Sequence, residues 1–94
     1  MNLGLEIRKT RKAQKINQQE LSRRTGLSQA YISQVENGHK KPSQDAIETI
    51  CEALNTHAGI LYWNSLTEQD VPENKRFAFK VIKPSVDRLL QRQD

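Results

Sequence analysis

The chain has 94 residues, 35% of them hydrophobic and 28% charged, and its formal net charge is +4. This length corresponds to one small domain and excludes most multidomain enzymes. The longest run of nonpolar residues, Gly59–Trp63, is far shorter than the ~20 residues of a membrane-spanning helix, and residues 1–12 lack the apolar segment of a signal peptide. We therefore expect a soluble cytoplasmic protein without a membrane partner.

The residues that usually perform catalysis or bind metals are few. Cys51 is the single cysteine, which excludes an internal disulfide and is typical of a reducing cytosol. With His39 and His57 it provides too few ligands for a zinc site without carboxylates. The sequence also lacks a Ser/His/Asp cluster and a glycine-rich phosphate loop. We expect no metal, no cofactor and no enzymatic activity.

The positive charge is concentrated in the N-terminal half. Residues 1–43 contain nine Lys and Arg against three Glu, a net charge of +6, whereas residues 44–94 contain six basic and eight acidic residues, a net charge of −2. This asymmetry is expected if the N-terminal half faces a polyanion such as nucleic acid. Solvated helix faces are the alternative interpretation.

Local signals predict two helices at the start of the chain. Nonpolar residues at helical spacing predict a helix over Leu3–Ala13. Asn17 is a suitable N-cap, and Glu20 three residues later can complete a reciprocal capping box. A short helix over Gln18–Thr25 is expected to follow and to end at Gly26, which readily adopts a left-handed conformation.

Three further helices are predicted before residue 66. Ser28 is the expected N-cap of a helix over Gln29–Glu36. Ser43 follows a proline and caps a helix over Gln44–Asn55, which has a nonpolar stripe along one face. A shorter helix is expected around Ala58–Ser65.

The last thirty residues show a different pattern. Thr67 can cap a turn with Asp70, and a helix is expected over Pro72–Ile82. Pro84 lacks an amide hydrogen and is expected to kink this segment or to separate it from a closing helix over Ser85–Gln93.

The most informative feature is the pair of short helices joined by a glycine turn. Such short helices cannot bury their own nonpolar faces, so neighbouring helices must hold them. The spacing directs Leu21, Leu27, Ile32 and Val35 inward. The residues directed outward are amides, hydroxyls or small side chains: Gln18, Gln29, Ala30, Ser33, Gln34 and Asn37.

These outward residues match the chemistry of DNA bases. A glutamine amide can both donate to and accept from an adenine edge in the major groove, and the methyl group of Ala30 can contact a thymine methyl. Each polar residue alone is more typical of the solvent-facing side of a helical bundle than of a DNA contact. The whole arrangement, flanked by Arg11, Lys40 and Lys41, favours DNA binding.

Residues 7–54 closely resemble the phage-repressor-like, or XRE, family of helix-turn-helix proteins. The matching motifs are N-Q-x-E-L at Asn17–Leu21, T-G-L-S at Thr25–Ser28, Y-I-S-x-x-E-N-G at Tyr31–Gly38 and the K-x-P stretch that follows. The resemblance implies an all-α, compact five-helix lambda-repressor-like DNA-binding domain, which we assign to residues 1–65. Residues 66–94 match no family pattern and are interpreted as a C-terminal helical extension.

The resemblance also implies roles for individual residues. Gln29, Ala30 and Gln34 of the recognition helix would read base edges. Arg11 would support the site by pairing with Glu36. The residues expected to contact the DNA backbone are Gln18, Ser28, Tyr31, Asn37 and Lys41.

Two positions leave local alternatives. Tyr31 either reaches a phosphate through its hydroxyl or packs its ring against the helix that begins at Gln44. Ser22 replaces the alanine that relatives usually carry between the two helices, and its hydroxyl can bond back to a carbonyl one turn earlier.

The sequence thus predicts a sequence-specific, double-stranded-DNA-binding transcriptional regulator. Relatives commonly bind inverted repeats as twofold dimers, and we expect a homodimeric repressor, since a small protein without a ligand domain can act by occupying a promoter. The nonpolar face of residues 77–90 is either a dimer surface or part of the chain's own core. The alternative function is an antitoxin that binds a partner protein through residues 66–94, or a restriction–modification controller. A protein-interaction module with a vestigial helix-turn-helix is less favoured, because the two glutamines of the recognition helix, Gln29 and Gln34, are intact.

Overall fold

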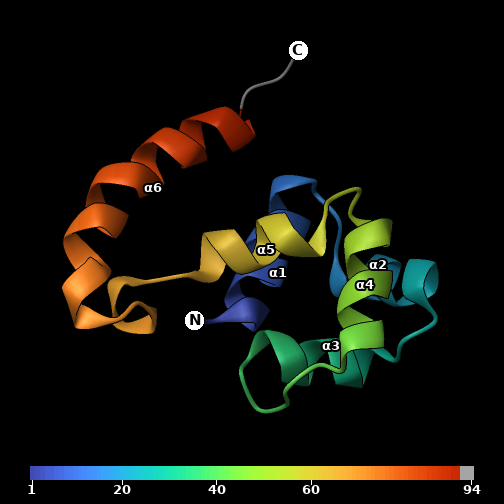
Figure 1. The fold of residues 1–94 in the computed structure, drawn as a ribbon. Helices are drawn as coiled ribbons and strands as arrows, with labels where there is room; N and C mark the ends of the chain where they lie inside the picture. The colour runs from blue at the N-terminus through green and yellow to red at the C-terminus, as the bar shows by residue number, and fades with distance from the viewer. Residues whose placement is uncertain (92–94) are drawn as a thin grey trace. The chain divides into compact units, whose positions relative to one another are not determined.

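A computed structural model describes residues 1–91, which form α-helices and two short 3-10 helices and contain no β-strand (Figure 1). The residues form two compact units, one spanning Asn2–Ser65 and the other comprising Met1 and the chain from Leu66 onward. No helix within residues 1–91 is long and apolar enough to cross a membrane. Because residues 1–91 form helices and no strand, the prediction of an all-α protein is confirmed. The first unit contains α1 (Leu3–Ala13), α2 (Gln18–Thr25), α3 (Gln29–Glu36), α4 (Gln44–Ala53) and α5 (Ala58–Ser65).

The core of this first unit takes residues from all five helices. Ile7, Leu21, Ile32, Ile50 and Leu61 come from α1 to α5 in turn, and all five are buried in one cluster. α1 packs on α3 and α5, while α2 packs on α3 and α4. Because each helix is too short to be stable alone, this shared core holds the helices in place.

The N-caps of three helices form as predicted. The side-chain oxygens of Asn17, Ser28 and Ser43 each accept a hydrogen bond from the backbone N–H three residues later, at 2.8, 3.0 and 3.1 Å. Gly26 ends α2 with a φ of 76°, the left-handed conformation that favours glycine. α4 ends at Ala53, two residues earlier than predicted, and the next residues turn toward α5.

Two side chains of α2 bond differently from the sequence-based expectation. The Glu20 carboxylate does not complete a reciprocal capping box but pairs with Arg23 at 2.5 Å and Arg24 at 3.5 Å. The Ser22 hydroxyl does not bond back along its own helix. It donates instead to the carbonyl oxygen of Leu27 at 2.5 Å and so fastens the turn between α2 and α3.

The contact between α1 and α3 requires a glycine. An added Cβ at Gly4 would lie 2.0 Å from the carbonyl oxygen of Val35, a separation that no side chain tolerates. The absence of a side chain at Gly4 therefore lets the backbones of α1 and α3 approach each other closely.

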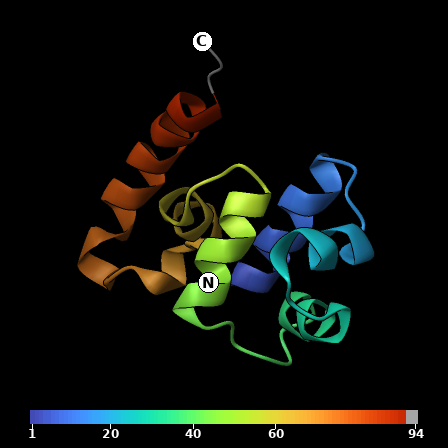
Figure 2. The ribbon, with the colours of Figure 1, turned by 90° about the vertical axis from the view of Figure 1, so that its right-hand side faces the viewer.

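The second unit consists of η1 (Glu68–Asp70), η2 (Glu73–Lys75) and α6 (Arg76–Gln91). Asp70 accepts a hydrogen bond from the backbone N–H of Thr67 at 2.9 Å, which agrees with the predicted capped turn. The predicted separation of two helices at Pro84 is wrong, because α6 continues through this residue (Figure 2). A proline removes only one backbone hydrogen bond, here to Lys80, and the helix absorbs this loss. The predicted end at Gln93 lies outside the described residues.

Candidate nucleic-acid interface

α2 and α3 lie side by side and form the helix-turn-helix unit (Figures 1 and 2). Leu21, Ile32 and Val35 are buried beneath the pair, as their spacing predicted, and Leu27 is half-buried in the turn. The turn is held by the left-handed Gly26 and by the hydrogen bond from Ser22 to Leu27 described above. This packing fixes which face of α3 remains accessible.

The accessible face of α3 carries the side chains predicted to read bases. Gln29, Ala30 and Gln34 are all exposed, while Ser33 is half-buried between them and the following residue Asn37. At 100° per residue these five positions occupy one side of the helix. The face bears no charge and offers amide, hydroxyl and methyl groups, which is the chemistry that base edges can bind.

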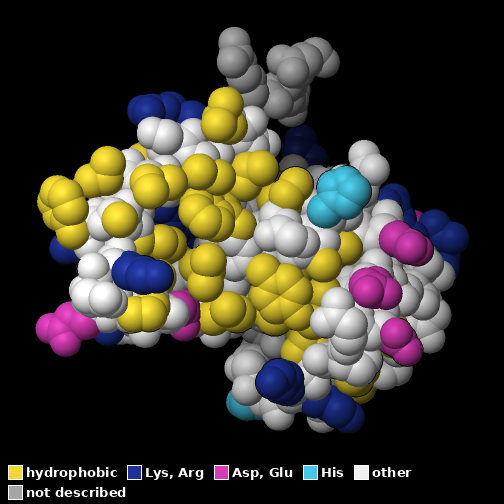
Figure 3. Space-filling view, viewed as in Figure 1, with side chains coloured by type: hydrophobic (Ala, Val, Ile, Leu, Met, Phe, Trp, Pro, Cys, Tyr) yellow, Lys and Arg dark blue, Asp and Glu magenta, His cyan; other side chains and the backbone are white. Residues whose placement is uncertain are grey.

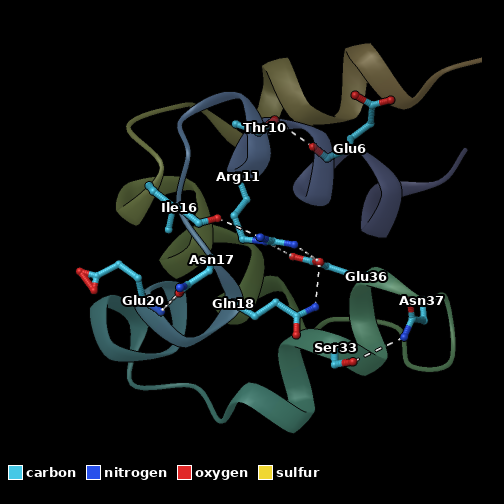
Figure 4. A network of polar contacts seen from close by, with 10 residues as sticks. All are labelled: Glu6, Thr10, Arg11, Ile16, Asn17, Gln18, Glu20, Ser33, Glu36 and Asn37. Atoms are coloured by element: carbon cyan, nitrogen blue, oxygen red, sulfur yellow. Dashed lines mark hydrogen bonds and ion pairs between the residues drawn. The ribbon is translucent and has the colours of Figure 1, made fainter.

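The last residue of α3, Glu36, forms a buried ion pair with Arg11 of α1 (Figure 4). The Nε and Nη2 atoms of Arg11 donate to the two carboxylate oxygens of Glu36, each at 2.8 Å. The remaining Nη1 group of Arg11 donates to the carbonyl oxygen of Ile16 at 2.8 Å. Sequence reasoning expected the pair but missed the carbonyl contact, for which the sequence contains no signal.

Gln18 joins this network from the first turn of α2 (Figure 4). Its Nε2 group donates to the Oε1 atom of Glu36 at 3.1 Å, and the side chain is half-buried. The carboxylate of Glu36, a residue of α3, therefore bonds to side chains of both α1 and α2. A glutamine amide has two N–H groups and a carbonyl oxygen, so the contact leaves further hydrogen-bonding capacity on Gln18.

The network keeps the Glu36 carboxylate ionised. Burial alone raises the pKa of Glu36, but the hydrogen bonds from Arg11 and Gln18, together with the charges of Arg11 and Arg8, outweigh that effect and lower the pKa. The hydrogen bond to Glu36 likewise raises the pKa of Arg11. The two charges thus stabilise each other, which is the condition under which a buried ion pair is tolerated.

The connection from α3 to α4 carries cationic side chains beside the recognition face. It leaves α3 through Gly38, whose φ is 78°, and includes the exposed Lys40 and Lys41. The ammonium group of Lys40 lies 5.2 Å from the ring centroid of Tyr31, a cation–π contact that sequence reasoning missed. In Figure 3, dark-blue side chains lie at the lower edge, where Figure 1 draws this connection.

The remaining predicted backbone contacts have partners within the protein. The Tyr31 ring packs against the core and its hydroxyl accepts a hydrogen bond from the backbone N–H of Ser43 at 3.3 Å, so packing toward α4 is the observed alternative. Ser28 is exposed and serves as the N-cap of α3. Asn37 donates to the hydroxyl of Ser33 at 3.4 Å. Contacts of these residues with phosphate remain predictions.

A two-helix unit with an accessible second helix, an uncharged polar face and flanking cations is the arrangement of a helix-turn-helix protein. The helix-turn-helix family model matches residues 7–61, more than half of the chain. The chain therefore belongs to the helix-turn-helix family.

Individual relatives agree with this assignment. Two strains of Mycobacterium tuberculosis each contain a protein described as an uncharacterized HTH-type transcriptional regulator, 41% identical over 59 residues. The match covers 63% of this chain but only 42% of each relative. The ImmF control region 10 kDa protein of Bacillus phage phi105 is 32% identical over 71 residues, which is 76% of both chains. No solved structure matches the chain.

Proposed function

We propose that this chain is a sequence-specific transcriptional regulator that binds an inverted-repeat operator as a homodimer and represses by occupying a promoter. The observation that carries the proposal is the exposed, uncharged face of α3, with Gln29, Ala30 and Gln34 accessible together. These three side chains read base edges in the major groove, whose width admits one helix. The phage relative is named for a control region, which supports a regulatory role.

In this proposal a second set of residues positions the protein on the DNA backbone without reading sequence. It consists of Gln18, Ser28, Tyr31, Asn37 and Lys41. The pair of Arg11 and Glu36 supports this set by joining α1, α2 and α3 through hydrogen bonds. Support comes from the network itself: because Gln18 is tied to Glu36, its remaining amide hydrogen is held at the start of α2. The cationic Lys41 is exposed beside α3.

The proposal is tested by fluorescence-anisotropy titration of DNA from upstream of the chain's own gene and of random DNA, at two salt concentrations. We expect tighter binding to the upstream DNA, two protomers per site, and weaker binding at higher salt because phosphate contacts release counterions. Equal, weak binding to both DNAs would contradict the proposal. An operator is then located by footprinting, and repression is measured with a promoter fusion.

One observation favours a second candidate function. α6 exposes several nonpolar side chains, as an antitoxin would if its extension bound a partner protein. An antitoxin, or a restriction–modification controller, would use the same DNA-binding surface. A stoichiometric second protein that copurifies with the natively expressed chain distinguishes the antitoxin from a stand-alone repressor.

A further inference from the structure

α6 carries more nonpolar surface than its own unit covers. None of its residues is buried, although nonpolar side chains occupy more than half of the helix circumference. Phe77 is 80% exposed, Val81 58%, Ile82 53% and Leu89 65%. Yellow side chains are correspondingly visible along α6 in Figure 3. A helix with so broad a nonpolar surface is normally covered by other parts of a protein.

Three of the exposed nonpolar residues of α6 lie in a row with Ser85, and two of them, Val81 and Leu89, are placed symmetrically about it. Phe77, Val81, Ser85 and Leu89 are spaced by four residues and therefore lie on one ridge of the helix. Val81 precedes Ser85 by four residues and Leu89 follows it by four. A twofold axis at Ser85 brings each Val81 beside the Leu89 of a second copy, and the small Ser85 allows the two helices to approach.

The polar groups on this row tolerate burial against another copy. The hydroxyl of Ser85 already accepts a hydrogen bond from the Nη2 group of Arg88 at 3.3 Å. The row contains no carboxylate that would select a basic partner. Other charged side chains of α6 are engaged elsewhere: Lys80 pairs with Glu68 at 3.6 Å, and Lys83 pairs with Asp87 at 3.3 Å. The row itself is thus nonpolar apart from Ser85, and the Arg88 guanidinium lies at its edge on the hydroxyl of Ser85.

The exposed area is sufficient for a modest dimer. From their exposed fractions, the four side chains Phe77, Val81, Ile82 and Leu89 of α6 offer at most roughly 500 Å² per copy. Two copies would then bury up to about 1,000 Å², the lower limit for a specific protein–protein interface. Each buried nonpolar side chain contributes about 1.5–3 kcal/mol when it leaves water completely, so a few such contacts can offset the entropy of association.

We propose that two copies of this chain associate through the exposed face of α6, antiparallel, with Ser85 at the twofold axis. Val81 of one copy packs against Leu89 of the partner subunit, and Ile82 borders this contact. The pairing deepens the proposed function and rests on it for its biological role, because an inverted-repeat operator requires two protomers related by a twofold axis.

The first test is sedimentation equilibrium of the full chain without DNA. We expect the wild-type chain to be dimeric, and the double variant Val81→Asp/Leu89→Asp to raise the dimer dissociation constant about a hundredfold or more, because two carboxylates would be buried without partners. Lys80→Asp is the matched control, since it introduces the same change in charge on the other side of α6. Circular dichroism verifies that all three proteins fold.

The second test is cysteine cross-linking under mild oxidation. Ser85→Cys is expected to form a covalent dimer, because the axis places the two Ser85 positions beside each other, while the native Cys51 is buried. Two Val81→Cys positions in an antiparallel pair lie about 12 Å apart along the axis, at ~1.5 Å per residue, too far for a disulfide. Lys80→Cys serves as the second control. Equal cross-linking at Val81→Cys and Ser85→Cys overturns the antiparallel arrangement.

These outcomes separate the inference from the proposed function. If the wild-type chain is dimeric without DNA but does not bind DNA selectively, the α6 pairing is supported and the proposed function as a sequence-specific regulator is contradicted. A chain that binds its operator yet is monomeric at high concentration, with no cross-link through Ser85→Cys, overturns the α6 pairing. That second outcome also results if the face packs on its own chain or binds a different protein.

Discussion

Arg11 and Glu36, which are 25 residues apart, are joined by two hydrogen bonds of 2.8 Å in the interior of the helix-turn-helix unit. The guanidinium and the carboxylate meet side by side, a geometry that only arginine among the cationic residues offers. Because Gln18 also donates to Glu36, the pair links the first helix to both helices of the DNA-binding motif. The candidate interface is therefore supported by a buried polar network as well as by the nonpolar core.

Removal of one partner of this pair should destabilise the fold strongly. Arg11→Ala leaves the Glu36 carboxylate buried without its counter-charge, and we expect the free energy of unfolding to fall by about 3 kcal/mol or more. Chemical denaturation at neutral pH measures this loss. Lys12→Ala is the matched control, because Lys12 is the next residue of α1 and is exposed; its effect should stay within about 0.5 kcal/mol. If Arg11→Ala and Lys12→Ala lowered the free energy of unfolding equally, the ion pair of Arg11 and Glu36 would contribute nothing to stability.

The same network predicts a pH dependence of stability. The folded-state pKa of Glu36 lies below its value in the unfolded chain, so its stabilising contribution is complete above the unfolded pKa of about 4.3 and is lost as pH falls through the folded pKa. Glu36→Gln should be less stable than the wild type at pH 7, and its stability should change less between pH 5 and pH 2.

Glu20 provides the comparison for this measurement. The hydrogen bond from Arg23 lowers the pKa of Glu20 to about 2, but the carboxylate lies on the surface, where solvent screens ion pairs. Glu20→Gln should therefore reduce the acid-induced loss of stability less than Glu36→Gln does. If Glu20→Gln had the larger effect, the surface cluster and not the buried network would govern acid unfolding.

Residues that read bases and residues that hold phosphates should respond differently to mutation. Gln34→Ala is expected to cost about 1–3 kcal/mol on the operator and to relax the preference at one base pair. Lys41→Ala should weaken binding to all DNA sequences similarly and reduce the slope of log K against log salt concentration by about one. Anisotropy titrations on specific and random DNA measure both quantities.

Gln91→Ala is the control for the DNA-binding variants, because Gln91 is an exposed glutamine at the end of α6. It should leave the affinity for the operator unchanged. Identical behaviour of Gln34→Ala and Lys41→Ala, with the same loss of affinity on every DNA and the same salt slope, would remove the distinction between base reading and backbone positioning.

The helix starts could be predicted because they depend on neighbouring residues. Asn17, Ser28 and Ser43 each cap a helix as expected, since an N-cap acts on a backbone N–H only three residues away. Pro84 shows the limit of such local rules. It was expected either to kink the segment or to separate two helices. The separation does not occur, because α6 continues through Pro84 and one lost hydrogen bond does not outweigh the rest of the helix.

Apart from the pair of Arg11 with Glu36, which the family resemblance implied, contacts between distant residues were not predicted from the sequence. The Nε2 group of Gln14 donates to the carbonyl oxygen of Leu54 at 2.6 Å, which satisfies a carbonyl at the end of α4 from 40 residues away. The contact of Gln18 with Glu36 was likewise unforeseen, although the residues themselves were assigned to the site. Such contacts depend on the distances and angles at which helices pack, and the residue types alone do not encode them.

Gly4 provides the clearest test of this packing. A glycine near the start of a helix normally gains stability on replacement by alanine, by up to about 1 kcal/mol. At Gly4, however, the new Cβ would lie 2.0 Å from the carbonyl oxygen of Val35, so α1 and α3 would have to separate. We expect Gly4→Ala to lower the free energy of unfolding by about 1–3 kcal/mol, the usual cost of overpacking.

Gly59 is the matched control for Gly4, since each is the second residue of its helix. A Cβ at Gly59 meets no atom within 4 Å, so Gly59→Ala should leave stability unchanged or raise it by up to about 1 kcal/mol. Thermal and urea denaturation of the two variants measure the difference. Because Val35 directly precedes Glu36, the displacement in Gly4→Ala should also weaken operator binding, whereas Gly59→Ala should not. A Gly4→Ala protein as stable as the Gly59→Ala protein would show that α1 and α3 do not approach each other this closely.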